Sequence, residues 1–503
     1  MYRLLRLVPA LFATLAAWGS VGHAQDFTGH SGRYKIMSIF SGKAVDLADF
    51  STDNGGNIML WNDLNGVNQQ WDFANLGSGY FSILSAHSGK AMEAYDWCTA
   101  DGCEVRQWDY WGGEPQQWQP IDMGWGNYKL RNRYNNLLLD VWGYDANAGA
   151  DLRQWSDVNG INQYWRIITP CGAGTPDASV TGAPGAYYVN GTSVGDNYLG
   201  AILQAISSVG TGQRVTVYAD GSIGDSYIAL PSNITFEVCG TMNVGYVAGH
   251  GAIEAISQSN VYIPHLKMTG SPYFGLRFAD DQNLHLGHIE LNMSGGLGIR
   301  FDRDLPGSTN VVMEYVYVNG TGNHGVETWN VDGLLVGAVV ARNTAYAGLL
   351  LNNTRNASIG LVYGENTATG TGYATLRFAN TNGQIDGAWP SNIYVDRVIS
   401  IGGGRGLFCV SNSGGATVNH IEFSNNGNNS ILLENCHNVA INGGTINGGG
   451  EVRIAARSEF PNSSDINISN LTITDTGVTE NPCGDNVNFS NITVVNGSYN
   501  VCN

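Results

Sequence analysis

The sequence predicts an all-β protein of two domains, each built from a repeat of a different length. Residues 32–168 contain three units with a period of 47 residues, and residues 213–475 repeat a looser unit of about 22–30 residues. In both halves, short apolar segments alternate with Gly, Asn and Asp turns, which is typical of strands. Only one segment, close to residue 200, has the apolar spacing of a helix.

Composition and charge exclude several classes of protein. The 503 residues carry a formal net charge of −18, and 43% of them are hydrophobic, which is enough to bury cores and excludes a disordered chain. Such an acidic chain repels phosphate backbones, so we expect no nucleic acid partner. An acidic substrate would need local positive charge.

The first 24 residues have the pattern of a secretory signal peptide. Arg3 and Arg6 precede an apolar core at 7–18, and small residues at Gly22 and Ala24 place the cleavage site after Ala24. A membrane anchor is the weaker alternative, because the apolar run is too short to span a bilayer and no later stretch approaches about 18 apolar residues. We therefore expect a secreted monomer without a membrane partner.

All eight cysteines follow this segment, and an even number in an exported chain indicates disulfides. Spacing alone does not determine how they pair. The two closest pairs, which would close short loops, are Cys98–Cys103 and Cys483–Cys502. The four remaining cysteines would then pair as Cys171–Cys239 and Cys409–Cys436.

Three residue series share the 47-residue period, which indicates a three-fold repeat. They are an acidic series, a tryptophan series, and a second tryptophan series that ends a Gln-Gln-Trp or Gln-Tyr-Trp triplet: Asp46, Glu93 and Asp140; Trp61, Trp108 and Trp155; Trp71, Trp118 and Trp165. Over residues 30–168 this pattern resembles the ricin-type β-trefoil lectins, also called family-13 carbohydrate-binding modules.

The resemblance implies that the triplets build the core and that each lobe has a pocket made of an acidic residue, an aromatic platform and an Asn-Gln pair. A carboxylate accepts hydrogen bonds from neighbouring sugar hydroxyls, and an aromatic face stacks on the apolar side of the ring. The first and third lobes contain the whole pattern: Asp46, Trp61, Asn68 and Gln69; Asp140, Trp155, Asn162 and Gln163. The second lobe has Glu93 and Trp108, but Pro115 replaces the Asn, so we expect weak or no binding there. The alternative is a trefoil that has lost sugar binding and acts as a spacer.

Residues 169–185 are rich in Gly, Pro, Ala and Thr and predict an interdomain linker. Asp196 then precedes an i, i+3, i+4, i+7 series, which predicts a short helix with Asp196 at its N-cap: Leu199, Ile202, Leu203 and Ile206.

Residues 186–503 resemble the right-handed parallel β-helix of the pectin-lyase-like superfamily, with this helix as the N-terminal cap. Units such as Gly275-Leu276-Arg277-Phe278 and Gly298-Ile299-Arg300-Phe301 are too short to bury their own apolar faces and must stack as coils around one core. A β-sandwich is the alternative, but its turns would recur about every 8–12 residues, which is shorter than the repeat seen here.

This register places charged side chains on the outside of successive coils, about 4.8 Å apart. Arg277, Arg300 and Glu327 are expected to form a ladder beside Asp302 and Trp329. The remaining outward positions and the neighbouring turns complete the predicted surface: Leu350, Arg377, Phe408, Leu432 and Arg453; Asp280, Asp281, Asp304 and His324. Such a ladder is either a structural network of ion pairs or a polysaccharide groove, and the exposed aromatic Trp329 favours the groove.

Two reactions fit the groove. In a lyase, Arg277 and Arg300 would neutralise a uronate carboxylate, an Arg or His324 would take the C5 proton, and Asp280, Asp281, Asp302 and Asp304 offer oxygen ligands for calcium. In a hydrolase, Glu327 and Asp302 would act as the carboxylate pair. No family signature decides between them.

A non-catalytic adhesin is a third possibility, but a lectin joined by a flexible linker to a β-helix is the usual layout of a secreted polysaccharide-degrading enzyme. The sequence therefore predicts an exported polysaccharide-degrading enzyme, a lyase acting on a uronate polymer, with the hydrolase and the adhesin as alternatives.

Overall fold

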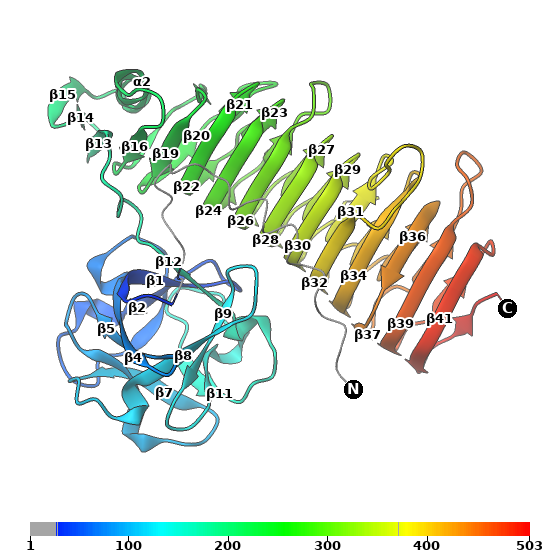
Figure 1. Cartoon of the computed structure of the whole chain (residues 1–503), viewed down its shortest axis with the longest axis horizontal. Coiled ribbons are helices and arrows are strands. Elements are labelled where there is room, and N and C mark those ends of the chain that lie inside the picture. Colours follow the sequence, from blue (N-terminus) through cyan, green and yellow to red (C-terminus); the bar gives the residue numbers. More distant parts are fainter. Residues whose placement is uncertain (1–26, 28, 371, 503) are drawn as a thin grey trace.

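The computed structural model describes Phe27 and residues 29–370 and 372–502, and it confirms an all-β protein of two parts. An N-terminal trefoil lies against the side of an elongated β-solenoid (Figure 1). The expected signal peptide, residues 1–24, lies outside the described residues. None of the described helices has the length and hydrophobicity needed to cross a membrane.

The trefoil is a 12-stranded sheet of antiparallel pairs. Its strands are β1 (Gly32–Ser38), β2 (Ala44–Leu47), β3 (Ile58–Trp61), β4 (Trp71–Gly77), β5 (Tyr80–Ser85), β6 (Ala91–Ala94), β7 (Cys103–Trp108), β8 (Gln117–Asp122), β9 (Tyr128–Asn132), β10 (Leu138–Val141), β11 (Leu152–Trp155) and β12 (Trp165–Ile168). Single turns of 3₁₀ helix separate them: η1 (Ala48–Phe50), η2 (Val67–Gln69), η3 (Tyr95–Trp97), η4 (Glu114–Gln116), η5 (Trp142–Tyr144) and η6 (Ile161–Gln163).

The tryptophans of the three triplets form the centre of the trefoil core, as the resemblance implied. Trp71, Trp118 and Trp165 are fully buried. Each indole N–H donates to a backbone carbonyl 26 residues earlier, at 3.1, 2.9 and 3.1 Å, so the buried polar atom of each ring is satisfied. The same hydrogen bond is therefore repeated within each of the three lobes.

The solenoid contains two long sheets of mainly parallel strands. The 12-stranded sheet, called here the short-strand face, consists of β18 (Ile228–Ala229), β21 (Gly251–Ile256), β23 (Phe274–Ala279), β25 (Leu297–Phe301), β27 (Val326–Trp329), β29 (Leu349–Asn352), β31 (Leu376–Ala379), β33 (Leu407–Cys409), β35 (Ile431–Glu434), β38 (Val452–Ala455), β40 (Val478–Glu480) and β42 (Tyr499–Asn500).

The 18-stranded sheet is called here the long-strand face. Its strands are β13 (Ala178–Ala183), β14 (Ala186–Val189), β15 (Thr192–Gly195), β16 (Arg214–Val217), β17 (Gly221–Ser222), β19 (Ile234–Val238), β20 (Thr241–Val244), β22 (Ser259–Gly270), β24 (Gln282–Met293), β26 (Thr309–Asn319), β28 (Asp332–Arg342), β30 (Arg355–Glu365), β32 (Ile393–Ile401), β34 (Ser413–Ser424), β36 (Cys436–Ile441), β37 (Gly444–Asn447), β39 (Ser464–Thr474) and β41 (Asp485–Val495).

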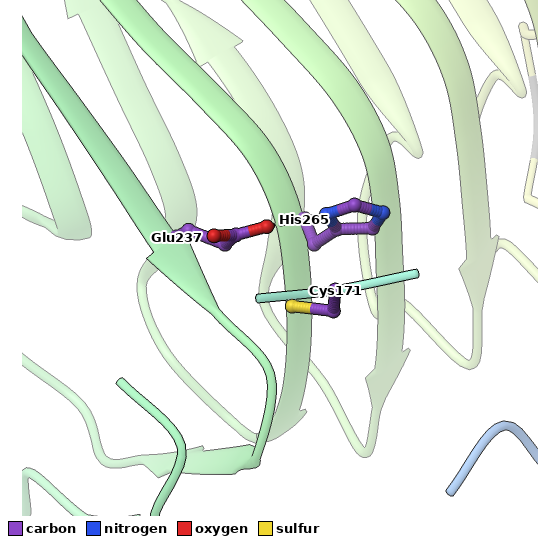
Figure 2. Close-up of side chains that lie close together, drawn as sticks. All are labelled: Cys171, Glu237 and His265. Atoms are coloured by element: carbon purple, nitrogen blue, oxygen red, sulfur yellow. Dashed lines mark hydrogen bonds and ion pairs between the residues drawn. The ribbon is translucent and has the colours of Figure 1, made fainter. Parts of the chain in front are cut away.

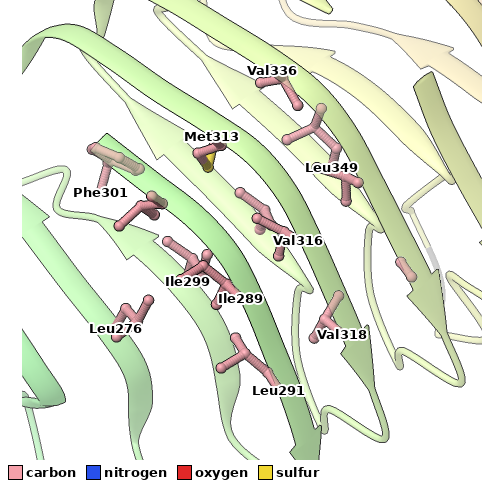
Figure 3. Packing of buried hydrophobic residues seen from close by; sticks show 14 of the residues in the cluster. Leu276, Ile289, Leu291, Ile299, Phe301, Met313, Val316, Val318, Val336 and Leu349 are labelled. Atoms are coloured by element: carbon pink, nitrogen blue, oxygen red, sulfur yellow. The ribbon is translucent and has the colours of Figure 1, made fainter. Parts of the chain in front are cut away.

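The solenoid core is a set of aligned apolar columns. Leu276 pairs in register with Ile299, and Ile299 pairs with Val326, so like side chains stack from coil to coil (Figure 3). These residues are fully buried, as the inward positions of the repeat predicted. A continuous core shared between coils explains how units of this length fold.

Asparagines stack at one corner of the solenoid and explain part of its composition. Asn260, Asn283 and Asn310 have φ values of 56°, 58° and 54°, a left-handed conformation that Asn tolerates better than most residues. Each side-chain amide donates to the Asn one coil earlier, starting with Asn260 to Asn233 at 2.8 Å. The ladder satisfies polar groups at a turn that recurs in every coil.

Helix α2 (Tyr198–Ser208) covers the first coils, where the sequence predicted a cap helix. The predicted N-cap was one residue early: the cap is Asn197, whose side chain accepts a hydrogen bond from Gly200 N at 2.9 Å, and not Asp196. Ile202 is buried, whereas Leu203 is exposed. The helix therefore closes the end of the apolar core with a narrower face than the sequence indicated.

Four disulfides join all eight cysteines in the pairs with the expected spacing: Cys98–Cys103, Cys171–Cys239, Cys409–Cys436 and Cys483–Cys502. Four disulfides are consistent with an extracellular protein.

The predicted linker is largely ordered structure. Residues 178–183 form strand β13, which pairs in parallel with β16 and so belongs to the solenoid. Cys171 is bonded to Cys239 at the end of β19. The Gly and Pro content indicated flexibility, but pairing and a disulfide fix this segment.

The trefoil also packs directly on the long-strand face, and the two domains share one apolar cluster. Tyr315 of β26 donates its hydroxyl to Ile39 O at 3.0 Å, and Arg342 of β28 donates to Phe40 O at 2.8 Å. Arg166 of β12 forms an ion pair with Glu314 at 3.1 Å. The trefoil is therefore docked along β22–β32 and does not move freely on a flexible linker.

Charged groups are buried in this interface. Lys35 and Asp63 form an ion pair, and Lys267 of β22 donates to the backbone carbonyl of Asp63. Burial alone would raise the pKa of Asp63, but the charges of Lys35 and Lys267 hold it below its usual range. A buried pair of this kind is costly to break, because removal of one partner leaves the other charge unpaired.

Two solenoid glycines make room for a trefoil tryptophan. A Cβ on Gly360 would lie 2.4 Å from Trp125 Cγ, and one on Gly337 would lie 3.0 Å from Trp125 O. We expect Gly360→Ala to lower the free energy of unfolding by about 1–3 kcal/mol, because the added methyl group overpacks the interface. Denaturant titration measures this. Gly443→Ala is the matched control, since its nearest neighbour would be 3.6 Å away; equal effects of both substitutions would contradict the docking role of Gly360.

Candidate functional site

The first lobe holds a carboxylate in a nest of amide donors. Asp46 lies on β2, and the Asn-Gln pair lies on η2. Asn68 Nδ2 is 3.1 Å from both Asp46 carboxylate oxygens, and Gln69 Nε2 is 2.8 Å from Oδ2. Burial raises the pKa of Asp46 to about 6, although these hydrogen bonds oppose the shift. The residues expected to form the pocket are thus brought together.

The third lobe repeats this arrangement. Asn162 Nδ2 is 3.0 Å from Asp140 Oδ2, and Gln163 donates to Ser156 O at 2.8 Å. Burial raises the pKa of Asp140 to about 7, against the hydrogen bonds of Gln163 and Asn162.

The second lobe is closed by its own side chain. Trp111 Nε1 donates to Glu93 Oε2 at 3.1 Å, and Gln116 Nε2 donates to the same oxygen at 2.7 Å. The Trp111 ring lies over Gly113, where an added Cβ would come within 1.8 Å of it. The indole therefore takes the position from which a sugar hydroxyl would reach Glu93. The sequence predicted a weak lobe from Pro115 and did not identify Trp111.

Equivalent glycines show how open each pocket is. A Cβ added to Gly66 of the first lobe would meet only Asn68, which belongs to the same lobe. A Cβ added to Gly160 of the third lobe would lie 2.2 Å from the Tyr144 hydroxyl. The first pocket is the most open of the three, and the third has Tyr144 across its edge.

The structure identifies a further aromatic series with the same 47-residue period. Phe50, Trp97 and Tyr144 end η1, η3 and η5, four residues after the acidic position, and they are 54%, 55% and 50% exposed. Each is held edge-on by an aromatic ring of another lobe: Phe50 by His87 at 5.3 Å, Trp97 by Tyr134 at 5.1 Å and Tyr144 by Phe40 at 5.7 Å. Exposed, supported rings beside a carboxylate suit sugar stacking. The sequence analysis missed them because each lobe uses a different residue type.

The predicted platforms Trp61 and Trp155 lie between lobes. Trp61 is on the same face of the β2–β3 pair as Asp46, since Asp46 pairs with Met59 and Ala44 pairs with Trp61. Its ring is near Gly149 of the third lobe, and the Trp155 ring is near Gly102 of the second. Each ring borders its own pocket and also packs against the neighbouring lobe.

The raised pKa values predict a pH dependence of sugar binding. The ionised carboxylate accepts hydrogen bonds from sugar hydroxyls, so affinity should be full above the pKa and should fall as pH decreases through it. In an Asp46→Ala variant, only the third lobe remains. Its affinity for sugar should fall by about tenfold for each pH unit below a pH of about 7. In an Asp140→Ala variant the same loss should begin about one unit lower, close to the pKa of Asp46. Titration calorimetry from pH 4 to 8 measures both; two identical profiles would contradict the assignment.

The charged ladder on the short-strand face is a closed network. Arg277 pairs with Asp302 at 2.9 Å and with Glu254 at 3.3 Å, and Arg300 pairs with Glu327. Glu327 also accepts from Trp329 Nε1 at 2.7 Å. Asp302 and Glu327 are buried, which differs from the open surface that the register predicted. These contacts favour the structural alternative for the four charged residues, and Trp329 is a partner of Glu327 and not a free platform.

His324 is arranged as a donor and not as a base. Its Nδ1 accepts the backbone N–H of Ala347 at 3.1 Å, so the proton of the neutral ring is on Nε2. Burial, with the charges of Arg377 and Arg300, lowers the pKa of His324 to about 3. Proton abstraction by His324 is therefore disfavoured.

The outward column beyond the ladder is apolar and covered. Leu350 and Phe408 are only 3% and 6% exposed, and they cluster with Ala347, Ala374 and Tyr373 from the segments between strands. The sequence register placed these side chains on an open surface. The segments that fold over the short-strand face bury them instead.

Arg377 lies in this covered column, between Leu350 and Phe408 in the register of the sheet. Its guanidinium stacks on Tyr373 and Phe408 at 4.9 and 5.1 Å. Within the described part of the chain it has no hydrogen bond or ion pair, and its Nε is buried without a partner. Burial lowers the pKa of Arg377, and the charge of Arg405 acts in the same direction, whereas Tyr373 and Glu327 oppose the shift.

Arg405 lies beside this group. Its guanidinium stacks on Phe408 at 4.9 Å, and Nε donates to Asn429 at 3.3 Å. Burial also lowers the pKa of Arg405. Tyr346 and Tyr373 stack at 4.3 Å between His324 and Arg377, so hydroxyl-bearing rings adjoin the positive charge. We call Arg377, Arg405, Tyr346, Tyr373 and Phe408 the arginine cluster.

The possible calcium ligands do not fit a calcium ion. Asp281 is buried and accepts the backbone N–H groups of Gln258 and Ala279, at 2.8 and 3.2 Å. Asp280 accepts from Ser257 at 2.7 Å, and the exposed Asp304 pairs with Arg303. Each of these carboxylates is bound by groups of the protein, and none belongs to a group of potential metal ligands in the described part of the chain.

A single group of potential metal ligands occurs among the described residues: Cys171, Glu237 and His265 (Figure 2). The Cys171 sulfur is bonded to Cys239 and is no thiolate. Glu237 pairs with Arg214 and His265, both at 2.9 Å. Burial alone would raise the pKa of Glu237, but His265, Gly172 N and Arg214 lower it to about 2. The group therefore has a structural role: its disulfide and ion pairs hold the segment at Cys171 against the first strands of the solenoid.

Comparison with known proteins agrees with the architecture of the first domain. The model of the family described as ricin-type beta-trefoil lectin domain-like matches residues 18–108 and 67–155. No curated protein matches the chain. The resemblance to ricin-type β-trefoil lectins is thus confirmed for the N-terminal domain, and the family match does not extend into the solenoid.

Three solved structures illustrate the likeness. The designed three-fold symmetric protein ThreeFoil is 40% identical over 27% of this chain and 97% of its own, with a TM-score of 0.27. An exo-β-1,3-galactanase from Clostridium thermocellum is 36% identical over 27% of this chain and 30% of its own, also with a TM-score of 0.27. A Macrolepiota procera ricin B-like lectin, solved with lactose, is 28% identical over 29% of this chain and 99% of its own, with a TM-score of 0.25. This chain thus spans less than a third of the galactanase.

Proposed function

We propose that this protein is an exported, monomeric polysaccharide-degrading enzyme that holds neutral sugars in its trefoil and cleaves a uronate polymer on its solenoid. The trefoil part rests on the Asp46 and Asp140 pockets, each with an Asn-Gln pair and an exposed aromatic ring. The solenoid part rests on one observation: Arg377 is a partly buried cation that forms no ion pair with any of the described residues.

An unpaired buried charge is expensive unless a ligand balances it. A guanidinium binds a carboxylate through paired, charge-assisted hydrogen bonds, and the C6 carboxylate of a uronate fits this role. The protein is acidic overall, so a local positive group would give selectivity for an acidic chain at this position. Tyr373, which is only partly buried, supplies an aromatic surface on which a sugar ring can stack.

The reaction proposed is β-elimination. Arg377 neutralises the carboxylate, which makes the C5 proton more acidic, and a base of the arginine cluster accepts this proton. The C4–O bond then breaks, a C4–C5 double bond forms, and the leaving oxygen takes a proton. Tyr346 and Tyr373 are the proton-carrying side chains next to Arg377, and they replace His324 as the candidates for these transfers.

Full pairing of Asp302 and Glu327 makes a carboxylate-pair hydrolase the weaker alternative, because a hydrolase needs one protonated carboxyl group. The same closed network favours a second candidate function, a non-catalytic binder of acidic glycans at the arginine cluster.

Incubation of the full chain with polygalacturonate, alginate and neutral polysaccharides separates these functions. New ultraviolet absorbance from an unsaturated uronate product supports the lyase. New reducing ends without absorbance indicate a hydrolase. Binding to uronate polymers without any cleavage identifies the non-catalytic binder, and neither binding nor cleavage of uronate polymers would refute the role of the arginine cluster.

A further inference from the structure

The trefoil and the solenoid enclose a cleft of about 260 Å³ beside the third lobe. The trefoil side consists of Tyr144, Gly160 and Ile161, and the solenoid side is formed by β32, β34 and β37. The third sugar pocket adjoins this cleft, because a Cβ added to Gly160, which lines the cleft, would contact both the Tyr144 hydroxyl and Asn162 Oδ1 of the pocket. The counterparts of Tyr144 in the other two lobes, Phe50 and Trp97, do not line this cleft and pack on His87 and Tyr134.

The solenoid wall of the cleft is a regular grid of outward side chains. Ile399 pairs in register with Glu422, and Glu422 pairs with Thr445. The second row, two residues along each strand, is Ile401, Ser424 and Asn447. The wall thus combines apolar groups with a carboxylate, two hydroxyls and an amide, which suits the mixed surface of a sugar chain.

The grid continues beyond the trefoil. Thr445 is followed in register by Thr472 and Thr493, and Asn447 is followed by Thr474. The trefoil covers the same face from β22 to β32, so the cleft is the point at which this face becomes open. A chain that leaves the third pocket through the cleft would meet hydroxyl and amide groups along its path.

The charges that border the cleft favour a neutral sugar chain over an acidic one. Asp140 and Glu422 both border this region, and Glu422 is paired with Arg397, which also donates to Asn159 O of the trefoil at 2.7 Å. Burial opposes ionisation of Glu422, but His420 and Arg397 lower its pKa, so the carboxylate remains charged. The paired Arg397 leaves no cation for an acidic sugar, and a uronate would be repelled.

We propose that the third lobe and strands β32, β34 and β37 form one composite site for a neutral oligosaccharide of several units. One sugar occupies the Asp140 pocket against Tyr144, and the following units lie in the cleft between Ile161 and Thr445. This proposal rests on the proposed sugar binding of the trefoil and extends it to the solenoid, which becomes a binding partner of the lectin and not only its support.

The test uses the full chain with Asp46→Ala, so that only the third lobe binds. An array of neutral gluco-, galacto-, manno- and xylo-oligosaccharides of one to six units identifies the preferred series, and calorimetry then compares its monosaccharide with its tetrasaccharide. We expect the tetrasaccharide to bind at least about tenfold more tightly. Adding Thr445→Trp, which fills the cleft from an exposed position, should abolish this gain and leave monosaccharide binding within about twofold.

Asn243→Trp is the matched control, because Asn243 is an exposed outward residue of β20 at the other end of the same face. It should retain the full preference for the longer sugar. Equal affinity for both lengths, or a preference that survives Thr445→Trp, would overturn the composite site while leaving the third pocket intact. If the protein without Asp46→Ala binds no sugar on the array, the proposed lectin function itself fails.

Discussion

Arg377→Ala is expected to lower cleavage of the uronate polymer by about 10²–10³-fold, the usual effect of removing one preorganised charge from a reaction centre. The substitution removes the cation that would balance the C6 carboxylate, so both substrate binding and the acidity of the C5 proton should suffer. Initial rates of ultraviolet absorbance measure the effect. Arg377→Lys should recover part of the rate, because it restores the charge without the paired hydrogen bonds.

Arg453→Ala is the matched control for this experiment. Arg453 lies in the same outward column, three coils further along, but it is exposed to solvent. Its loss should leave the rate within about twofold, as surface substitutions usually do. A rate unchanged by Arg377→Ala would remove the arginine cluster from the reaction. Unchanged binding of uronate polymers would remove it from recognition as well.

The double substitution Asp46→Ala and Asp140→Ala is expected to abolish binding to neutral glycans. Each carboxylate is the acceptor at the centre of its pocket, and its loss leaves the Asn-Gln donors without their partner. Each single substitution should leave one functional lobe, whereas the double variant should lose at least about a hundredfold in avidity on a multivalent glycan surface.

Asp72→Ala is the control for the trefoil, since the side chain of Asp72 is 43% exposed and forms an ion pair with Arg33 at 2.8 Å, away from the pockets. Glu93→Ala tests the second lobe directly and should leave binding unchanged, because Trp111 already occupies that carboxylate. Glycan binding that persists in the double variant would refute the assignment of the first and third lobes.

Features that repeat in the sequence were predicted well. The period of Trp71, Trp118 and Trp165 identified the trefoil, and the alternation of each solenoid unit identified the inward column from Leu276 to Val452. Both follow from local rules of side-chain direction that hold in every repeat. The grouping of Asp46 with Asn68 and Gln69, and of Asp140 with Asn162, was implied by the resemblance that this repeat carries, and the structure places these residues together.

The rest depends on contacts between segments that have no pattern in common. Gly337 and Gly360 look like ordinary small residues of a coil until Trp125 is placed on them. Trp111 differs from its counterparts Leu64 and Val158, so the closed second lobe could not be recognised from the repeat. Arg277, Arg300 and Arg377 occupy equivalent positions in sequence, yet only the register of the neighbouring coils shows which of them have carboxylate partners.

The docked trefoil has a further consequence for how the protein would move along its substrate. A lectin on a flexible linker samples many positions. Binding of one sugar by such a lectin does not determine which glycosidic bond lies at the second domain. Here the two parts share one apolar cluster and several buried hydrogen bonds. A sugar held in a lobe would therefore lie at a constant separation from the arginine cluster. The products of cleavage would then have a preferred length, set by the geometry between the two domains.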